Sequence, residues 1–306
     1  MAVKFALWTP KTPRPDNLPD SVDFMADESK GTVILIHGLT GTPHEMKALA
    51  VCLQRAGYSV ICPRLAWHGE PLYLLKRARW QEFYQSVKDA YHRAPADKPV
   101  FTAGLSMGAL LALLLAEEFP ERIAGTACFS PTLFYDGWNV SWSRFLLPLM
   151  YFTPLRNFFY HKEELPYGIK NEKIRARIHK YYKTAKLSDS AEAVKYGYPY
   201  FPATLFCELR KVINNLKKKL SAIKSPVLLV QAYDDDMTSP KNSRFIHRTI
   251  SSSRKEIFFL YNSYHVITAD QEREKAAEKM KDFFDSITGQ AIDSENSITE
   301  KITVNV

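Results

Sequence analysis

A serine between two glycines is the strongest chemical signal in the chain. The pentapeptide Gly104-Leu105-Ser106-Met107-Gly108 directly follows a strand-like run, Pro99 to Ala103, and opens an apolar helical pattern. A nucleophile elbow requires this arrangement, because the sharp strand-to-helix turn strains the serine backbone and the small residues on either side let neighbouring backbones pass closely. The pentapeptide pattern arises by chance about 0.1 times in a chain of this length. Its position between a strand and a helix predicts that Ser106 is a nucleophile.

A nucleophilic serine needs a base, and we predict that this base is His265. In sites built on a nucleophile elbow, the acid and the histidine follow the serine along the chain. Of the four histidines that do so, His161 and His179 lie in an aromatic-rich segment and His247 lies inside a predicted helix. His265 stands between the last predicted strand and the last predicted helix. That position places it on a loop at the carboxyl edge of the sheet.

Three adjacent carboxylates are candidates for the acid that orients this histidine. Asp234, Asp235 and Asp236 follow the apolar run Val227 to Gln231 after two intervening residues. One of them should orient the imidazole of His265 and stabilise the imidazolium that forms during proton transfer. The other two would then cap the following helix or face solvent. The residues alone leave open which of the three is the acid.

The oxyanion of the tetrahedral intermediate needs two hydrogen-bond donors. The backbone N–H of Met107, directly after the nucleophile, is one candidate. The second is the N–H of Leu39, which lies in the loop His37-Gly38-Leu39-Thr40-Gly41 after the strand-like run Thr32 to Ile36. We interpret His37 as a structural, hydrogen-bonding histidine rather than as a second base.

The elements that must position these residues alternate along the chain. Short apolar runs separated by longer helical patterns predict an α/β fold with a mostly parallel central sheet flanked by helices. The predicted strands are Thr32–Ile36, Ser59–Cys62, Val100–Ala103, Ile123–Phe129, Val227–Gln231 and Glu256–Leu260. The predicted helices are Glu45–Ala56, Trp80–Arg93, Met107–Glu118, Ala203–Leu220, Asn242–Ile250 and Gln271–Ile287.

This alternation is interrupted between residues 132 and 202, where aromatic residues and prolines are dense. A structureless loop of this length would be unusual inside a compact domain. We therefore expect a discontinuous core, residues 1–131 and 203–288, with an inserted helical cap at 132–202 and a mobile tail at 289–306. Trp138, Trp142 and Phe145 in the cap are the candidate substrate-binding residues.

Composition and charge restrict the compartment and the partners. The net charge of +8 and the basic clusters at 170–186 and 210–219 are interpreted as solvated faces rather than as a nucleic-acid site. No secretion signal and no apolar run long enough to span a membrane is visible, and the four cysteines form no metal-ligand motif. We expect a cytoplasmic protein without a metal or an organic cofactor, whose oligomeric state the sequence leaves open.

Five motifs give the chain a family resemblance. It resembles the bacterial carboxylesterase and monoacylglycerol-lipase-like branch of the α/β-hydrolase superfamily. The motifs are HGLTGTP at 37–43, CPRLAWHG at 62–69, AGLSMGALLAL at 103–113, QAYDDDMTSP at 231–240 and HVITADQERE at 265–274. From the first to the last they span nearly all of the chain outside the cap and the two termini. The last motif is the most specific of the five.

The resemblance implies an α/β-hydrolase fold and selects one acid. In that family the acid stands five residues before the proline of the fourth motif, which corresponds to Asp235 and Pro240 here. At two positions near the expected mouth of the site, this chain has a larger side chain than the family usually has. Tyr264 precedes His265 where a small residue is usual, and Trp67 stands where a glycine is common.

The predicted function is that of a serine carboxylic-ester hydrolase. It would act on a small-molecule ester with an apolar acyl chain through an acyl-enzyme. One alternative is a thioesterase. Another is a lipid hydrolase of the monoacylglycerol lipase or lysophospholipase type, with peripheral membrane contact through the cap segment 144–152. We favour a buried cap helix for that segment, because prolines interrupt its amphipathic period. An intact set of serine, histidine and acid argues against a non-catalytic binding protein with this fold.

Overall fold

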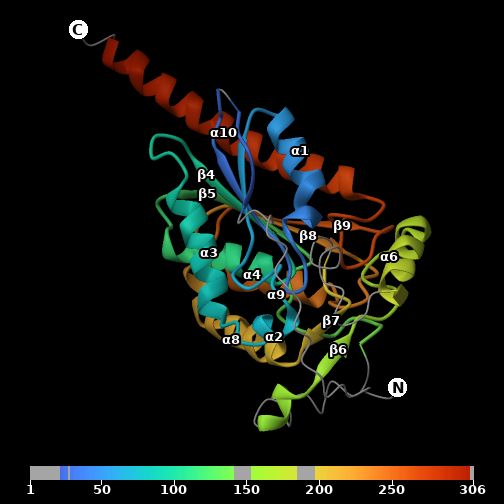
Figure 1. Ribbon diagram of the computed structural model, residues 1–306. Coiled ribbons are helices and arrows are strands. Elements are labelled where there is room, and N and C mark those ends of the chain that lie inside the picture. Colours follow the sequence, from blue (N-terminus) through green and yellow to red (C-terminus); the bar gives the residue numbers. More distant parts are fainter. Residues whose placement is uncertain (1–20, 27, 141–152, 185–196, 304–306) are drawn as a thin grey trace.

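A seven-stranded sheet forms the centre of the molecule (Figure 1). The computed structural model describes residues 21–26, 28–140, 153–184 and 197–303. The strand order is β1-β3-β2-β4-β5-β8-β9, and of these strands β1 alone runs antiparallel to its neighbour. The strands are β1 Ser21–Phe24, β2 Thr32–Ile36, β3 Ser59–Pro63, β4 Val100–Leu105, β5 Ile123–Phe129, β8 Val227–Ala232 and β9 Lys255–Leu260.

The central strands are apolar on both faces because helices cover both faces. Every residue of β2, β3, β4 and β8 is buried. Near-continuous apolar strands of this kind are typical of parallel sheets between two helical layers. The sheet therefore divides the interior into two hydrophobic clusters, one on each side.

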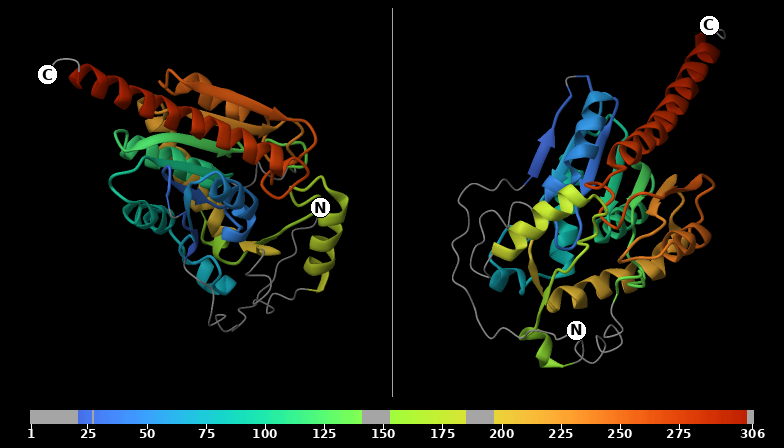
Figure 2. Two further views of the ribbon diagram at one scale, coloured as in Figure 1. Left: turned by 90° about the horizontal axis from the view of Figure 1, so that it is seen from above. Right: turned by 90° about the vertical axis from the view of Figure 1, so that its right-hand side faces the viewer.

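Two groups of helices make the outer layers (Figure 2). Residues of α1 and α10 belong to the cluster on one face, and residues of α3, α4, α8 and α9 belong to the cluster on the other. The C-terminal part of α10 projects beyond the body of the molecule (Figures 1 and 2). The helices are α1 Lys47–Arg55, α2 Leu72–Leu75, α3 Trp80–His92, α4 Met107–Glu118, α8 Thr204–Lys219, α9 Lys241–Thr249 and α10 Arg273–Thr303, with 3-10 turns η1 Pro43–Met46 and η4 Leu220–Ala222.

The helix after Ser106 is the most deeply buried of those described. Residues 107–116 of α4 are all buried, and the helix packs against β4, β5 and α8. A helix that is apolar around its whole circumference must lie in the interior. The strand and helix on either side of Ser106 are therefore fixed by the core, which keeps the turn between them rigid.

The segment between β5 and β8 contains both kinds of secondary structure. Its described part holds the turn η3 Pro154–Asn157, the helix α6 Glu172–Thr184 and a small antiparallel pair, β6 Tyr160–Lys162 with β7 Tyr200–Pro202. The sequence predicted a helical cap over residues 132–202. The described part is thus helical only in part, because the extended strand β7 begins directly after Pro199, ends at Pro202 and pairs with β6.

The predicted fold class is confirmed, and the predicted core elements match the observed ones within about two residues, with three exceptions. The helix predicted from Glu45 begins instead as the 3-10 turn η1, because Pro43 starts it and Thr42 caps it. The short elements β1 and α2 were not predicted. The final helix continues past Ile287 to Thr303, although the mobility of the tail 289–306 stays a prediction. No helix in the described ranges is both long and apolar enough to cross a membrane.

Candidate active site

Ser106 sits in a strained turn between β4 and α4. Its backbone has φ 57° and ψ −114°, which a residue with a side chain adopts only where the surrounding structure imposes it. The two flanking glycines make the turn possible. A Cβ on Gly104 would lie 2.2 Å from the backbone of Gly108, and a Cβ on Gly108 would lie 2.2 Å from the carbonyl oxygen of Ile36. The close passage of backbones that the sequence predicted is therefore present.

The Ser106 hydroxyl opens into a large cavity. Its Oγ lies 2.8 Å from Oγ1 of Thr132, a buried residue in the loop after β5. Ser106, Thr132 and His265 all line this cavity, which has a volume of about 1460 Å³. Within the described residues the Ser106 hydroxyl pairs with Thr132 and not with the imidazole. A hydrogen bond between a catalytic serine and its histidine is often formed only once substrate is bound.

His265 is held by Asp235. The Nδ1 atom of His265 lies 3.1 and 3.0 Å from the two carboxylate oxygens of Asp235, and both side chains are almost fully buried. The carboxylate also accepts hydrogen bonds from the Gln231 amide, the Thr238 hydroxyl and the backbone N–H groups of Met237 and Thr238. Because the carboxylate is held from several sides, the imidazole it contacts has a fixed orientation.

The other two aspartates have different surroundings. Asp236 is buried, and its carboxylate accepts hydrogen bonds from the backbone N–H groups of Gly168 and His265, each at 3.2 Å. Asp234 is about half exposed and pairs with Lys170 at 3.7 Å. Asp236 therefore anchors the backbone around the histidine, whereas Asp234 lies at the surface. Asp235 is the one of the three whose side chain touches the imidazole.

The loop that carries His265 is attached to the inserted segment. Asp270 is fully buried, and its carboxylate accepts hydrogen bonds from the backbone N–H groups of Tyr264, Lys170 and Asn171 at 2.7 to 2.8 Å. The N–H of Val266 donates to the carbonyl oxygen of Gly168 at 2.9 Å. These contacts explain why an aspartate stands in the last motif, because it binds two chain segments that are about a hundred residues apart.

The candidate oxyanion loop is wrapped around a glutamate. The N–H of Gly38 donates to the Glu45 carboxylate, which fills the space that a side chain at Gly41 would need. The carbonyl oxygen of Leu39 accepts a hydrogen bond from His68 Nε2 at 2.7 Å. Leu39 lies in the loop after β2 and borders the same cavity as Ser106, and Met107 is the first residue of α4. The loop that is predicted to bind the oxyanion is therefore held by side chains behind it.

His37 is engaged with the backbone through both ring nitrogens. Its Nδ1 lies 2.9 Å from the carbonyl oxygen of Gly38, and its Nε2 accepts the N–H of Leu65 at 3.1 Å. Burial and the neighbouring His68 hold the pKa of His37 well below its ordinary value. A neutral histidine with both nitrogens occupied has no free position for proton transfer.

With this geometry established, comparison with known proteins identifies the family. Residues 27–272, four fifths of the chain, match the family described as serine aminopeptidase, S33. The chain belongs to this family. It is a serine hydrolase with the α/β-hydrolase fold, of the lipase and esterase type, and the resemblance expected from its motifs is confirmed.

Curated relatives and solved structures agree with this family. The chain is 28% identical to a thermostable monoacylglycerol lipase of Bacillus sp. strain H-257, over 85% of this chain and 93% of the relative. It is 24% identical to a carboxylesterase of Bacillus subtilis strain 168, over 83% and 92% of the two chains.

Solved structures extend this comparison to the fold. A structure reported for the metagenome-derived lipolytic enzymes LipS and LipT matches with a TM-score of 0.69 and 27% identity, over 88% of this chain and 99% of the other. A monoglyceride lipase of Saccharomyces cerevisiae matches with a TM-score of 0.69 over 93% and 97% of the chains, and its 16% identity shows the fold alone.

The cavity of this serine hydrolase has both polar and apolar lining. Two carboxyl groups in it, those of Glu45 and Glu163, lie close enough to His265 for their charges to interact with the imidazole. The inserted segment and α8 contribute a group of aromatic and aliphatic side chains, Tyr135, Ile169, Ile174, Ile178, Tyr181, Tyr182, Phe201, Phe206 and Leu209. Further lining comes from α1 and α10 and includes the charged residues Lys47, Arg55, Arg273 and Lys281. A cavity with both kinds of lining suits a ligand with one apolar end and one polar end.

The aromatic residues predicted to bind substrate are not those that line the cavity. Trp138 is 56% exposed, donates its indole N–H to the carbonyl oxygen of Asp234 and packs against Tyr264. It does not border the cavity, so its predicted role in the acyl pocket lacks support. Trp142, Phe145 and the segment 144–152 lie outside the described residues. Tyr264 and Trp67, the two departures from the family pattern, are also absent from the described lining.

Two carboxyl groups in the cavity were missed by the sequence analysis. Burial raises the pKa of Glu45 to about 7, and burial together with Asp236 raises the pKa of Glu163 to about 7. Glu163 also hydrogen-bonds to Thr40. Glu45 stands eight residues after His37, at the start of a helix, and Glu163 stands in the cap, where no local pattern marks it. Among the described residues no group of His, Cys, Asp and Glu is arranged to hold a metal ion.

The carboxylates around His265 are expected to affect the pH dependence of hydrolysis. Burial alone lowers the pKa of His265, but Asp235, Asp236 and Glu45 outweigh burial and raise it above the ordinary value of 6.5. A base must be neutral to accept a proton, so kcat/KM should fall as pH falls through this raised pKa. We expect an acid limb with a midpoint above pH 6.5 in a pH profile with a soluble ester.

Glu163→Gln tests whether a further carboxylate in the cavity, in addition to Asp235, Asp236 and Glu45, contributes to this limb. Removing the carboxylate removes a charge that favours protonated His265, so the midpoint should move to lower pH. Glu164→Gln is the matched control, since Glu164 is exposed. A wild-type midpoint below pH 6.5, or equal shifts in the two variants, would contradict the assignment.

Proposed function

We propose that this enzyme hydrolyses carboxylic esters that join an apolar acyl chain to a small polar alcohol. The observation that carries this proposal is the cavity at Ser106, which contains two carboxyl groups whose charges reach His265 and a group of aromatic and aliphatic side chains. The relatives named monoacylglycerol lipase and carboxylesterase support ester hydrolysis over peptide hydrolysis. A monoacylglycerol has the two ends that this cavity fits.

The proposed mechanism assigns one step to each group. Ser106 Oγ attacks the ester carbonyl carbon while His265 Nε2 accepts its proton, and Asp235 stabilises the imidazolium through the opposite nitrogen. The N–H groups of Leu39 and Met107 bind the oxyanion. His265 then gives the proton to the departing alcohol, which leaves an acyl-enzyme. Water deprotonated by His265 releases the acid and regenerates Ser106.

The first attack requires the serine hydroxyl to leave Thr132. Rotation about the Cα–Cβ bond of Ser106 breaks the 2.8 Å contact with Thr132 and turns Oγ toward the imidazole. Exchange of one hydroxyl partner for another costs little, because a typical hydrogen bond contributes about 1 kcal/mol net. The observed side-chain position is therefore compatible with the proposed chemistry.

Glu163 and Thr40 are the candidates to bind the alcohol. Both line the cavity, Thr40 belongs to the candidate oxyanion loop, and the two side chains are hydrogen-bonded to each other. A carboxyl group with a pKa of about 7 can accept or donate a hydrogen bond near neutral pH. The two free hydroxyl groups of a monoacylglycerol would replace the Thr40 hydroxyl as its partner.

The cavity predicts a preference for medium or longer acyl chains over acetyl. Each buried methylene contributes about 0.8 kcal/mol, so four further carbons would raise kcat/KM by more than about a hundredfold. The gain appears in kcat/KM because the acyl chain remains bound in the transition state. A panel of monoesters from acetyl to decanoyl should show a steep increase.

Two variants locate the acyl pocket within the cavity. Phe206→Ala should flatten the chain-length profile without loss of acetyl ester cleavage, because Phe206 lines the cavity from α8. Trp138→Ala, an aromatic residue outside the described lining, is the matched control and should retain the wild-type profile. A wild-type enzyme that cleaves acetyl esters best would reject the apolar acyl chain. Equal flattening by both variants would reject this placement of the pocket.

Labelling with a fluorophosphonate probe separates an enzyme from a binding protein with the same fold. The probe should add one adduct to the wild-type chain, detected by intact mass, and peptide mapping should place it on Ser106. Absence of an adduct, or an adduct elsewhere, would contradict the proposed nucleophile.

A further inference from the structure

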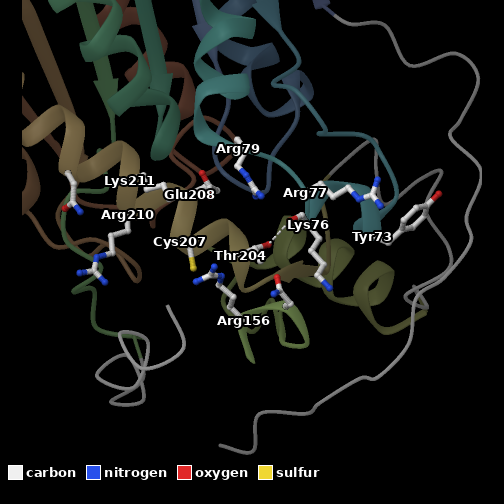
Figure 3. Close-up of a pocket in the computed structure, with 12 residues that line it drawn as sticks. Tyr73, Lys76, Arg77, Arg79, Arg156, Thr204, Cys207, Glu208, Arg210 and Lys211 are labelled. Carbon is white, nitrogen blue, oxygen red and sulfur yellow. Dashed lines mark hydrogen bonds and ion pairs between the residues drawn. The ribbon is translucent and has the colours of Figure 1, made fainter. Parts of the chain in front are cut away.

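A second cavity lies beside α8 (Figure 3), and the residues of α8 that line it differ from those that border the Ser106 cavity. Its volume is about 770 Å³, and none of its lining residues borders the first cavity. It is formed by α2 and the residues that follow it, by η3 and by the first part of α8. The lining residues are Tyr73, Lys76, Arg77, Arg79, Arg156, Asn157, Thr204, Cys207, Glu208, Arg210, Lys211 and Asn214.

The lining is strongly cationic. Six lysine and arginine residues face one carboxylate, that of Glu208. This carboxylate is buried and already has partners, since it accepts hydrogen bonds from the Trp80 N–H at 3.0 Å and from Lys211 at 2.7 Å. Within the described part of the chain, Lys76, Arg77 and Arg79 form no ion pair. These three cations therefore give the cavity positive charge that no carboxylate of the described residues neutralises.

Two guanidinium groups approach the same stretch of α8 from opposite sides. Figure 3 shows the Arg79 side chain extending toward α8 from the start of α3, and the Arg156 side chain extending toward it from η3. Thr204, Cys207 and Glu208 of α8 lie between them. The helix is fixed on this side, because the Thr204 hydroxyl donates to the carbonyl oxygen of Lys76 at 3.2 Å. The two arginines thus emerge from separate elements around a common space.

Like charges in a concave site repel one another unless an anion enters, and the concave shape concentrates their field. Guanidinium groups bind phosphate oxygens with paired hydrogen bonds, and lysine adds a compact point charge. A cavity of this volume holds more than one phosphate group. Phe158 is 55% exposed, and its ring centroid lies 5.8 Å from Nζ of Lys76. It therefore offers an apolar surface next to this lining lysine.

We propose that this cavity binds a phosphate-bearing ligand, either a free phosphorylated compound or the headgroup of an anionic phospholipid. The site is separate from ester hydrolysis and does not depend on it. The two cavities share one helix, since Phe206 and Leu209 of α8 face the Ser106 cavity while Cys207 and Glu208 face the cationic one. A ligand in the second cavity would therefore restrain the position of α8, which also forms part of the proposed acyl pocket.

The test measures binding of two probes to protein in which Ser106→Ala prevents ester cleavage. Isothermal titration with inorganic pyrophosphate at low salt reports a free phosphorylated ligand. Flotation with phosphatidylcholine vesicles, with and without phosphatidate, reports a headgroup. The pocket variant combines Lys76→Gln, Arg79→Gln and Arg156→Gln. The matched control combines Lys218→Gln, Lys224→Gln and Arg248→Gln, three exposed cations outside the cavity.

We expect the parent protein to bind at least one probe and the pocket variant to bind it at least about 30-fold more weakly, since each basic residue near phosphate contributes about fivefold. The control variant should lose less than about threefold. Binding of pyrophosphate indicates the free ligand, and binding of phosphatidate vesicles alone indicates the headgroup.

A charge-conserving variant covers the case in which the pocket variant does not fold, as judged by its unfolding midpoint. Arg79→Lys with Arg156→Lys keeps the charge and removes the paired hydrogen bonds, so it should bind with an intermediate affinity. The proposal is overturned if the parent protein binds neither probe, if the pocket and control variants lose binding equally, or if the lysine variant binds as well as the parent. None of these readouts requires hydrolysis.

Discussion

Ser106→Ala is expected to lower kcat for a soluble ester by about 10⁴ to 10⁶, while the fold remains intact. The residue supplies the attacking atom, and removal of one member of such a catalytic unit abolishes the covalent route. The alanine side chain fits the same turn, because the strained backbone is imposed by β4, α4 and the flanking glycines. The measurement is the hydrolysis rate under saturating ester, with the thermal unfolding midpoint as the test of the fold.

Thr132→Val is the matched control for this variant. It removes the hydroxyl 2.8 Å from Ser106 Oγ but leaves the nucleophile in place. We expect a change in kcat of less than about tenfold, because the contact is broken anyway during attack. Retention of more than a tenth of the wild-type rate in Ser106→Ala would reject Ser106 as the nucleophile. A loss in Thr132→Val as large as in Ser106→Ala would show that the hydroxyl pair acts as a unit.

Asp235→Asn is expected to lower kcat by about 10⁴. An amide in place of this carboxylate favours the wrong tautomer of the histidine and cannot stabilise the imidazolium. The variant also removes the charge that raises the pKa of His265, so the acid limb of the residual activity should move to lower pH. Hydrolysis rates across a pH series measure both effects.

The neighbouring aspartates provide two controls for the same chemistry. Asp234→Asn should change kcat by less than about threefold, because Asp234 forms an exposed pair with Lys170. Asp236→Asn should lower the unfolding midpoint more than the rate, since one of its two backbone hydrogen bonds, to Gly168 or to His265, would meet an amide N–H group. Equal and mild losses of activity in all three variants would reject Asp235 as the orienting acid.

The local sequence pattern predicted the strands and helices of the core and the turn that carries the nucleophile. Alternating apolar runs and helical periods depend on the burial of each element, so they are visible without the tertiary structure. The same is true of Gly104 and Gly108, because a close backbone passage tolerates no side chain wherever it occurs. His265 was predicted from its position after the last strand, since the carboxyl ends of parallel strands meet at one edge of the sheet.

The choice among the three aspartates needed more than local pattern. Adjacent residues in a loop point in different directions, and those directions are set by contacts with Gln231, Thr238 and the N–H of Gly168. Spacing to Pro240 in related proteins selected Asp235, and the structure places that residue against the imidazole. The residues alone did not distinguish it from its neighbours.

By itself the sequence determined the α/β architecture, the turn at Ser106 and the loop position of His265, because each depends on the period or size of residues close together in the chain. Only the tertiary structure decided which side chains surround them. It placed Glu45 and Glu163 in the cavity, turned Trp138 outward and gathered six cations around the first part of α8. These placements depend on contacts between segments far apart in the sequence, such as Asp270 with Lys170, and no local period encodes them.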